Sequence, residues 1–149
     1  MSNAILELCW QLPVNEVAAG DVIIEEGVNH TNRLYVLKEG EVEIVRGGVQ
    51  IATAQVPGTI LGEMSYLLKR PHSATVRALS PVRLLVVEDP EAFFSQSGVG
   101  IAVARVLAAR LNSLGRMMSE VRGQLDTERA DAARMHEVFR QLEGKVSGG

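Results

Sequence analysis

The last third of the sequence carries an apolar pattern that repeats every seven residues. Successive apolar positions are separated by alternating steps of four and three residues, and Glu128 is the one polar residue among them. The positions of this apolar seam are Leu107, Leu111, Leu114, Met118, Val121, Leu125, Ala132, Met135, Phe139, Leu142 and Val146. Such a repeat predicts a long helix that packs along one face against another helix.

The predicted helix is too long for the rest of the chain to cover. From Val99 to Lys145 it would extend about 70 Å at a rise of about 1.5 Å per residue. Its simplest partner is a second copy, so we predict that the 98–149 segment forms a coiled-coil homodimer, with either direction of pairing open. The contacts would be Leu107, Leu111, Leu114, Met118, Val121 and Leu125. The alternative is a helix that lies against its own β domain, since an apolar stripe would serve that packing over the first turns.

Short β-rich runs separated by turn residues dominate the chain up to about residue 88. A short helix is expected first, over Ala4–Trp10. Runs of strand length follow at Val14–Val17, Asp21–Glu25, Arg33–Lys38, Glu41–Val45, Val49–Gln55, Ser73–Ala78 and Val82–Val87. Gly47 and Gly48 stand where a two-residue hairpin turn needs positive φ. This spacing predicts a small sandwich or closed roll of antiparallel strands.

Composition excludes several classes of function. A net charge of −3, with acidic and basic residues interleaved along the helix, gives no reason to expect direct contact with nucleic acid. The single cysteine, Cys9, cannot form an intramolecular disulfide, and no apolar run approaches the roughly 20 residues of a membrane span. The histidines, His30, His72 and His136, include no close pair, so no metal site is expected. We therefore expect a cytoplasmic protein that is not an enzyme.

The segment from Leu61 to Val76 has the properties of an anion-binding turn between two strands. Gly62 permits a tight turn, and Glu63–Leu68 can form one short helix whose first backbone N–H groups are unpaired donors. Such donors attract phosphate, and Pro71 ends the helix by restricting the residue before it. Because a helical turn between strands is common, these residues alone leave a purely structural role open.

The same segment resembles the phosphate-binding segment of the cyclic-nucleotide-binding domain family. The resemblance is carried by Leu61-Gly62-Glu63-Met64-Ser65 and by Pro71-His72-Ser73-Ala74-Thr75-Val76, and it extends over roughly residues 13–125. Upstream, Gly20–Gly27 and Leu34–Gly40 resemble the family's first strands and glycine-marked turns. The resemblance implies an antiparallel β-roll of the double-stranded jelly-roll type over residues 1–97, followed by the long helix of residues 98–149.

The resemblance also implies a set of ligand-binding residues. Gly62 and Glu63 would lie beside the ribose, with the Glu63 carboxylate accepting from its 2′-hydroxyl. Backbone N–H groups of the short helix and of Ala74 would hold the cyclic phosphate, and the Ser73 hydroxyl would reach the phosphate or a guanine amino group. The predicted set is Gly62, Glu63, Met64, Ser65, His72, Ser73 and Ala74, with Arg70 and Thr75 as further candidates.

His72 departs from the family pattern, which has arginine at this position. The arginine guanidinium is always charged and can donate two parallel hydrogen bonds, whereas imidazole is mostly neutral near pH 7. Losing a charged hydrogen bond costs about 1.5 to 3 kcal/mol, or roughly tenfold to 150-fold in affinity. Cyclic AMP or cyclic GMP would therefore bind weakly. Arg70 could substitute for the missing arginine, although a solvated loop charge is the simpler interpretation.

Two functions follow from these observations. The first is a non-enzymatic sensor or regulatory module, in which a bound cyclic nucleotide moves the long helix through a hinge at residues 95–100. The second is a dimerisation or scaffold module without a ligand. Regulators of the catabolite-activator type continue into a helix-turn-helix domain, which this sequence lacks, so direct reading of DNA is not expected.

Overall fold

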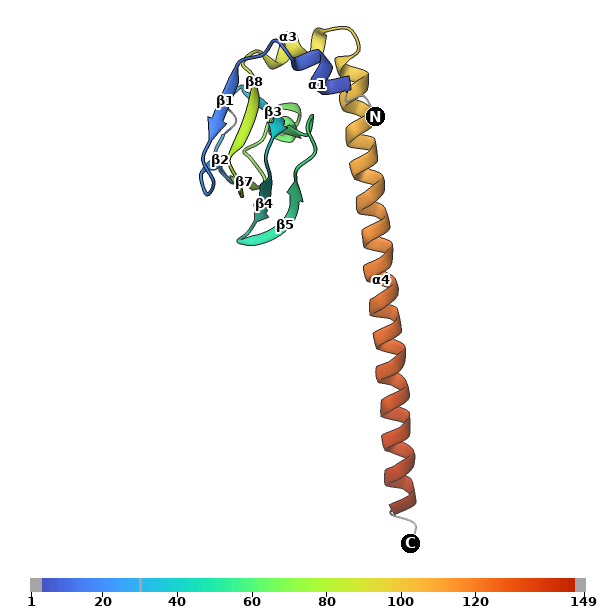
Figure 1. Cartoon of the computed structure of the whole chain (residues 1–149). Helices are drawn as coiled ribbons and strands as arrows, with labels where there is room; N and C mark the ends of the chain where they lie inside the picture. Colours follow the sequence, from blue (N-terminus) through green and yellow to red (C-terminus); the bar gives the residue numbers. More distant parts are fainter. Residues whose placement is uncertain (1–3, 30, 147–149) are drawn as a thin grey trace. The chain divides into compact units, whose positions relative to one another are not determined.

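The computed structural model describes residues 4–29 and 31–146. His30, the first three residues of the predicted 1–97 domain and the last three residues of the predicted 98–149 segment lie outside the described residues. The chain divides into two compact units, Met1–Val103 and Ala104–Gly149, each described by itself below. The helices of the described residues are α1 (Ala4–Cys9), α2 (Glu63–Leu68), α3 (Pro90–Ser95) and α4 (Val99–Val146) (Figure 1).

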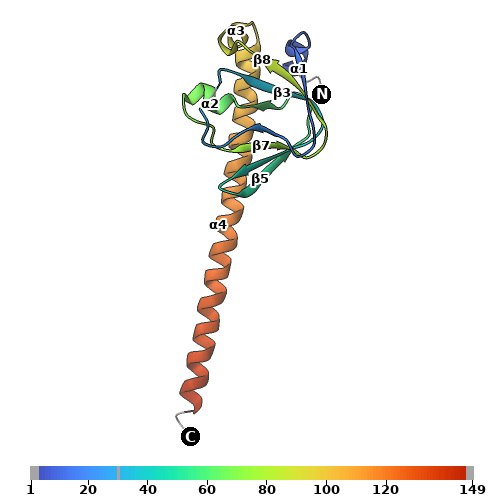
Figure 2. The same ribbon diagram turned by 90° about the vertical axis from the view of Figure 1, so that its left-hand side faces the viewer.

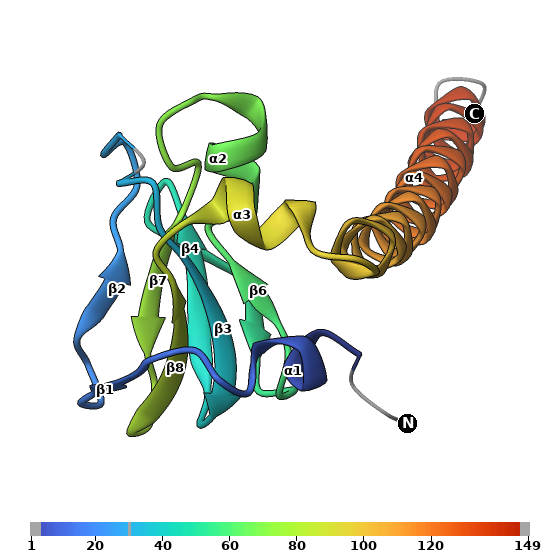
Figure 3. The same cartoon turned by 90° about the horizontal axis from the view of Figure 1, so that it is seen from above.

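The first unit contains two antiparallel four-stranded sheets, which confirms the predicted β-roll. One sheet has the strand order β1-β8-β3-β6 and the other the order β2-β7-β4-β5. Figure 3 shows strands of the two sheets in the first unit, with α2 and α3 at one end of them. The strands are β1 (Val14–Val17), β2 (Val22–Ile24), β3 (Leu34–Glu39), β4 (Val42–Arg46), β5 (Val49–Ala54), β6 (Ile60–Leu61), β7 (Thr75–Ala78) and β8 (Val82–Val87).

Alternating side chains of both sheets build the core of this unit. Burial removes apolar surface from water, the main favourable contribution to folding. The core cluster contains Ile24, Leu37, Val42, Leu61, Val76, Ala78, Val82 and Leu84. The sheets thus form one buried core, and their ends carry the connecting turns and short helices.

Two turns between strands depend on glycine residues. Gly47 and Gly48 have φ values of 57° and 79° and join β4 to β5, as a two-residue turn with two positive φ angles requires. Gly40, between β3 and β4, has a φ of +99°, and a Cβ there would lie 2.4 Å from the carbonyl oxygen of Pro81. Gly40 therefore allows the turn between β3 and β4 to approach the turn between β7 and β8 closely.

The sequence missed two elements, β6 and α3. β6 has only two residues, Ile60 and Leu61, and is defined by its pairing with Tyr35 and Val36 of β3. α3 begins after Asp89, whose side chain accepts a 3.0 Å hydrogen bond from the Ala92 N–H. An N-terminal capping residue followed by proline is a helix-start signal.

The second unit consists of α4 beyond its first turn. Residues Val99 and Val103 are buried in the first unit, whereas the seam residues from Leu111 to Leu125 are 49–70% exposed. The helix has 48 residues, about 72 Å at the usual rise per residue, and is continuous through Gly115 and Gly123 (Figures 1 and 2). Among the described residues, no helix combines the length and apolar character needed to cross a membrane.

Candidate functional site

The predicted short helix forms at the expected residues, and two polar residues of its first turn are buried. β6 ends at Leu61, and Gly62 turns the chain into α2 with a φ of 89°. Glu63 and Ser65 are 3% and 5% exposed, whereas Met64 between them is 51% exposed. Buried polar groups need hydrogen-bonding partners, and Glu63 is engaged within the protein. The first turn of α2 therefore presents polar groups to the interior and Met64 to solvent.

His72 lies beside the start of α2, held there by its backbone. Its N–H donates to the carbonyl of Val28 at 2.9 Å, and its carbonyl accepts from the N–H of Gly27 at 2.8 Å. The imidazole Cε1 is 3.7 Å from the place that a Cβ on Gly62 would occupy, and Ile24 Cδ1 is 3.2 Å from that place. The fold thus brings His72, Gly62 and the turn after β2 together.

Glu26 ties the turn after β2 to two other segments. Its N–H donates to the Thr75 hydroxyl at 3.0 Å. Its carboxylate accepts from the N–H of Gly47 at 3.0 Å and 3.3 Å. The Thr75 hydroxyl therefore holds this turn, while Ser73 beside it is exposed and Ala74 is half-buried. The glycine-marked turn at Gly27 was a sequence signal, but its pairing with residues 72–75 was not predicted.

Arg70 is tied to the end of α2 through its backbone. The Ser65 hydroxyl donates to the Arg70 carbonyl, and the Arg70 N–H donates to the Ser65 carbonyl at 3.2 Å. Lys69, with a φ of 52°, makes the left-handed turn that these bonds close. The Ser65 hydroxyl thus has a structural partner, and Arg70 is exposed on the surface two residues before His72.

An aromatic contact joins α2 to α3. The rings of Tyr66 and Phe94 are stacked with centroids 5.6 Å apart and planes 14° from parallel. Phe93 meets Phe94 edge-on at 5.5 Å. The sequence analysis did not identify this contact, because the aromatic residues are 28 positions apart in the chain. It connects the predicted ligand segment with the helix that leads into α4.

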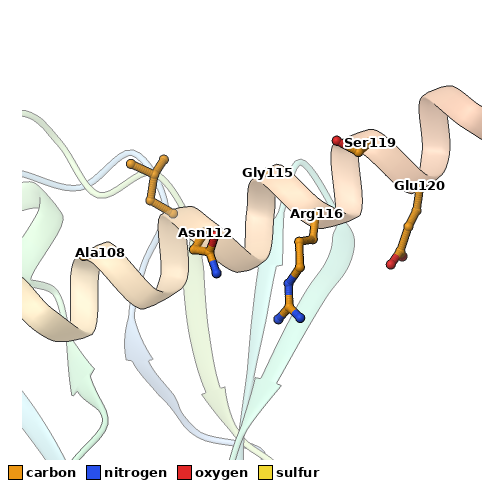
Figure 4. A pocket seen from close by; sticks show the side chains of 7 residues that line it. Ala108, Asn112, Gly115, Arg116, Ser119 and Glu120 are labelled. Atoms are coloured by element: carbon orange, nitrogen blue, oxygen red, sulfur yellow. The ribbon is translucent and has the colours of Figure 1, made fainter.

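Two other features of the described residues lie apart from this segment. No group of three or more histidine, cysteine, aspartate or glutamate side chains among the described residues could hold a metal ion. A shallow hollow runs along one side of α4, where Asn112, Arg116 and Glu120 project together (Figure 4). It is lined by Ala108, Leu111, Asn112, Gly115, Arg116, Ser119 and Glu120.

Two curated proteins illustrate the sequence similarity. An ABC transporter ATP-binding protein of Mycobacterium tuberculosis is 43% identical over 68 residues, which are 43% of this chain and 20% of that protein. A cGMP-dependent protein kinase of Caenorhabditis elegans is 33% identical over 84 residues, 56% of this chain and 10% of the kinase. The chain thus matches only a fifth or less of the length of these relatives.

Solved structures show the same fold. The catabolite activator protein of Thermus thermophilus matches with a TM-score of 0.66 and 25% identity, over 81% of this chain and 60% of that one. The N-terminal domain of a transcriptional regulator of Streptomyces coelicolor matches with a TM-score of 0.53 and 31% identity, over 74% and 81%. The cyclic nucleotide-binding domain family itself matches residues 14–94. Since this match spans more than half of the chain, the protein belongs to the cyclic nucleotide-binding domain family.

Proposed function

We propose that this protein is a non-enzymatic regulatory module that binds cyclic AMP or cyclic GMP weakly between α2 and the 72–75 segment. The observation that carries the proposal is the convergence of the two halves of the predicted site. The His72 imidazole lies 3.7 Å from the Cβ position at Gly62, although ten residues separate them in sequence. The residues proposed to bind are Gly62, Glu63, Met64, Ser65, His72, Ser73 and Ala74, with Arg70 and Thr75 at the margin.

The proposed roles follow the family pattern. Glu63 would accept from the ribose 2′-hydroxyl, and backbone N–H groups from Met64, Ser65 and Ala74 would hold the cyclic phosphate. Ser73, exposed beside His72, would add a hydroxyl that donates to the phosphate or accepts from a guanine amino group. His72 would supply a single hydrogen-bond donor where the family has an arginine guanidinium, which is always charged and can donate two hydrogen bonds. We therefore propose that the affinity for the nucleotide is low.

Restoring the arginine tests this site. His72→Arg replaces an imidazole, which donates one hydrogen bond, by a charged guanidinium, which can donate two. The variant should therefore raise the affinity for cyclic AMP or cyclic GMP at least about tenfold in titration calorimetry. His136→Arg is the matched control, since it makes the same change on an exposed residue of the other compact unit. An unchanged affinity in His72→Arg would contradict the proposed site.

The pH dependence of binding gives a second measurement at the same residue. Histidine side chains gain a positive charge as the pH falls through the range from about 8 to about 5, and a charged imidazole attracts phosphate more strongly. Wild-type protein should bind the nucleotide more tightly at about pH 6 than at about pH 8, and His72→Arg should lose most of that difference. Equal affinity at both pH values would exclude a contribution from the histidine charge.

The proposed output is the long helix. Tyr66 on α2 stacks on Phe94 of α3, and the proposed hinge at residues 95–100 runs from the last residue of α3 into the start of α4. A ligand that moves α2 would therefore move α3 through this stack. We propose that α4 dimerises through Leu107, Leu111, Leu114, Met118, Val121 and Leu125, so that the change is passed between two copies.

A ligand-free scaffold is the second candidate, favoured by His72 in place of arginine and by the long exposed seam of α4. Thermal unfolding distinguishes the two functions, since a ligand that binds only the folded state must raise its stability. A shift of the unfolding temperature with millimolar cyclic nucleotide supports the sensor. Mass spectrometry of the purified protein would show directly whether a nucleotide is retained.

A further inference from the structure

The seam of α4 contains one charged position, and its neighbours define how two copies can pair. In heptad notation, Leu111, Leu125 and Phe139 occupy position a, while Leu114, Glu128 and Leu142 occupy position d. Leu111 and Phe139 are 70% and 60% exposed, so this face has no partner within the described residues. A charge at a seam position costs stability and commonly fixes the register and direction of a coiled coil.

We propose that two copies of α4 pair in parallel and in register, and that Glu128 of each copy bonds to Arg129 of the other. This inference rests on the dimerisation proposed above. In a parallel pair, a side chain at position d enters the hole formed by Leu125, Glu128, Arg129 and Ala132 of the second copy. Arg129 brings an opposite charge to the hole, and Ala132 leaves space for the two long side chains.

The residues that flank the seam agree with the parallel direction. In such a pair, each residue at position g faces position e of the next heptad on the second copy. These facing positions are Arg110 with Gly115, Met117 with Arg122, Gln124 with Arg129, Asp131 with His136, and Val138 with Glu143. No pair joins like charges, and Asp131 faces an imidazole. Arg110 would face Gly115, which lines the hollow along α4 (Figure 4).

The antiparallel pairing that overlaps the whole seam is opposed by charge. It aligns Leu111 with Leu142 and Leu125 with Glu128, so an apolar side chain covers the seam carboxylate. In this direction, g faces g and e faces e, which places Arg110 opposite Lys145 and Arg122 opposite Arg129. Each of these like-charged contacts occurs twice by symmetry. The parallel pair has one like-charged contact in the seam, between the two Glu128 side chains, and each of them lies next to Arg129 of the other copy. The antiparallel pair has two kinds of like-charged contact, each present twice, so charge favours the parallel pair.

Cysteine cross-linking of the full chain measures the direction of pairing. Leu142→Cys should form a disulfide-linked dimer under mild oxidation, because parallel register places the two residues 142 opposite each other. Arg140→Cys is the control, since position b points away from the seam and its side chain is 71% exposed. Native Cys9 is fully buried and does not compete.

Each other outcome overturns a defined part of the inference. If Leu142→Cys links only to Leu111→Cys in a mixture of the two variants, the pairing is antiparallel and the dimer itself stands. If neither variant links and sedimentation shows a dimer, the copies meet through another surface. If sedimentation of the wild-type chain shows only monomer, the proposed dimerisation fails as well.

A charge exchange measures the Glu128–Arg129 contact. Glu128→Arg and Arg129→Glu each place like charges together in a parallel pair, so each should raise the dimer dissociation constant at least about tenfold in sedimentation equilibrium. A one-to-one mixture restores opposite charges at both contacts, and the mixed dimer should dissociate like the wild type. A tighter homodimer of Arg129→Glu would instead indicate antiparallel pairing, since that change relieves the contact with Arg122.

Discussion

At the scale of single residues, Gly40 stands where any side chain would collide with another part of the backbone. Its φ of +99° is unfavourable for any side chain, and a Cβ would meet the Pro81 carbonyl oxygen at 2.4 Å and the Val82 Cα at 2.9 Å. Both of these neighbours are backbone atoms of the turn that begins β8, so they cannot rotate away. The β3–β4 connection therefore depends on the absence of a side chain.

Gly40→Ala should lower the free energy of unfolding by about 2 to 4 kcal/mol, because it adds a strained φ and an overlap with backbone. Gly48→Ala is the matched control: its φ is also positive, at +79°, but a Cβ there meets no atom within 4 Å. It should cost about 1 kcal/mol from strain alone. Urea unfolding of both variants measures the difference, and equal losses would disprove the overlap.

Cys9 provides a residue-scale prediction of reactivity. Burial raises the pKa of its thiol to about 11, because desolvation disfavours the thiolate. Below about pH 9 the thiol is protonated in the folded state and in the unfolded chain, and between pH 9 and about 11 only the unfolded chain loses the proton. Stability from this group is thus fully present below pH 9 and falls as the pH rises toward 11.

A thiol reagent at pH 8 should accordingly react slowly with the folded protein and rapidly in denaturant, since the thiolate is the nucleophile. The Arg140→Cys variant controls for reagent access, because its added thiol lies on an exposed position of α4. Rapid modification of Cys9 in the folded state would show that the α1 region opens readily.

At the scale of secondary-structure elements, the contact between α2 and α3 is the route by which the proposed ligand segment would influence the following helix. The Tyr66–Phe94 stack is the aromatic contact that joins them, at 5.6 Å between centroids. Aromatic pairs of this geometry contribute about 0.5 to 1.5 kcal/mol beyond the area they bury. The two short helices should therefore behave as one coupled pair.

A double-mutant cycle of Tyr66→Ala and Phe94→Ala should give an interaction energy of about 0.5 to 1.5 kcal/mol in urea unfolding. The control cycle combines Phe94→Ala with Ile51→Ala on the edge strand β5, where the two losses should add. If the Tyr66 and Phe94 losses also add, α2 and α3 are not coupled through these rings.

The sequence predicted elements well where local pattern decides them. Val14–Val17, Glu63–Leu68 and Val82–Val87 match the predicted bounds, because alternation and glycine–proline punctuation are local signals. β6 was missed because two residues carry no periodicity, and its identity comes from pairing with β3. The hydrogen bonds of His72 with Gly27 and Val28 could not be predicted from local pattern either, since they join segments more than 40 residues apart. The family resemblance supplied the residues that we propose bind the ligand, but only the fold shows His72 beside Gly62.

At the scale of the whole molecule, the long exposed seam of α4 is the feature from which we predict the state of association. Leu114 and Leu125 are 52% and 49% exposed along a single helix. Burying such a seam between two copies removes apolar surface from water on both. The chain should therefore be a dimer in solution.

Changing Leu114 and Leu125 together to aspartate should convert the dimer to monomer in sedimentation, because charges would oppose each other in the seam. The thermal unfolding of the β-roll should change little, since both residues belong to the other compact unit. Ser113→Asp with Ala130→Asp adds the same charge on outward positions of α4 and should leave the dimer intact. A monomeric wild type, or a dimeric seam variant, would disprove this association.

The Glu26 carboxylate has a consequence beyond the turn that it stabilises. It accepts from the Gly47 N–H at the tip of the β4–β5 hairpin, while the neighbouring Gly27 N–H donates to the His72 carbonyl. An occupant that shifted His72 would pull on the 25–28 turn and so loosen or tighten the bond at Gly47. The rate at which the Gly47 amide exchanges with solvent deuterium should therefore change when a ligand shifts His72, and an unchanged rate would show that the turn does not pass on such a shift.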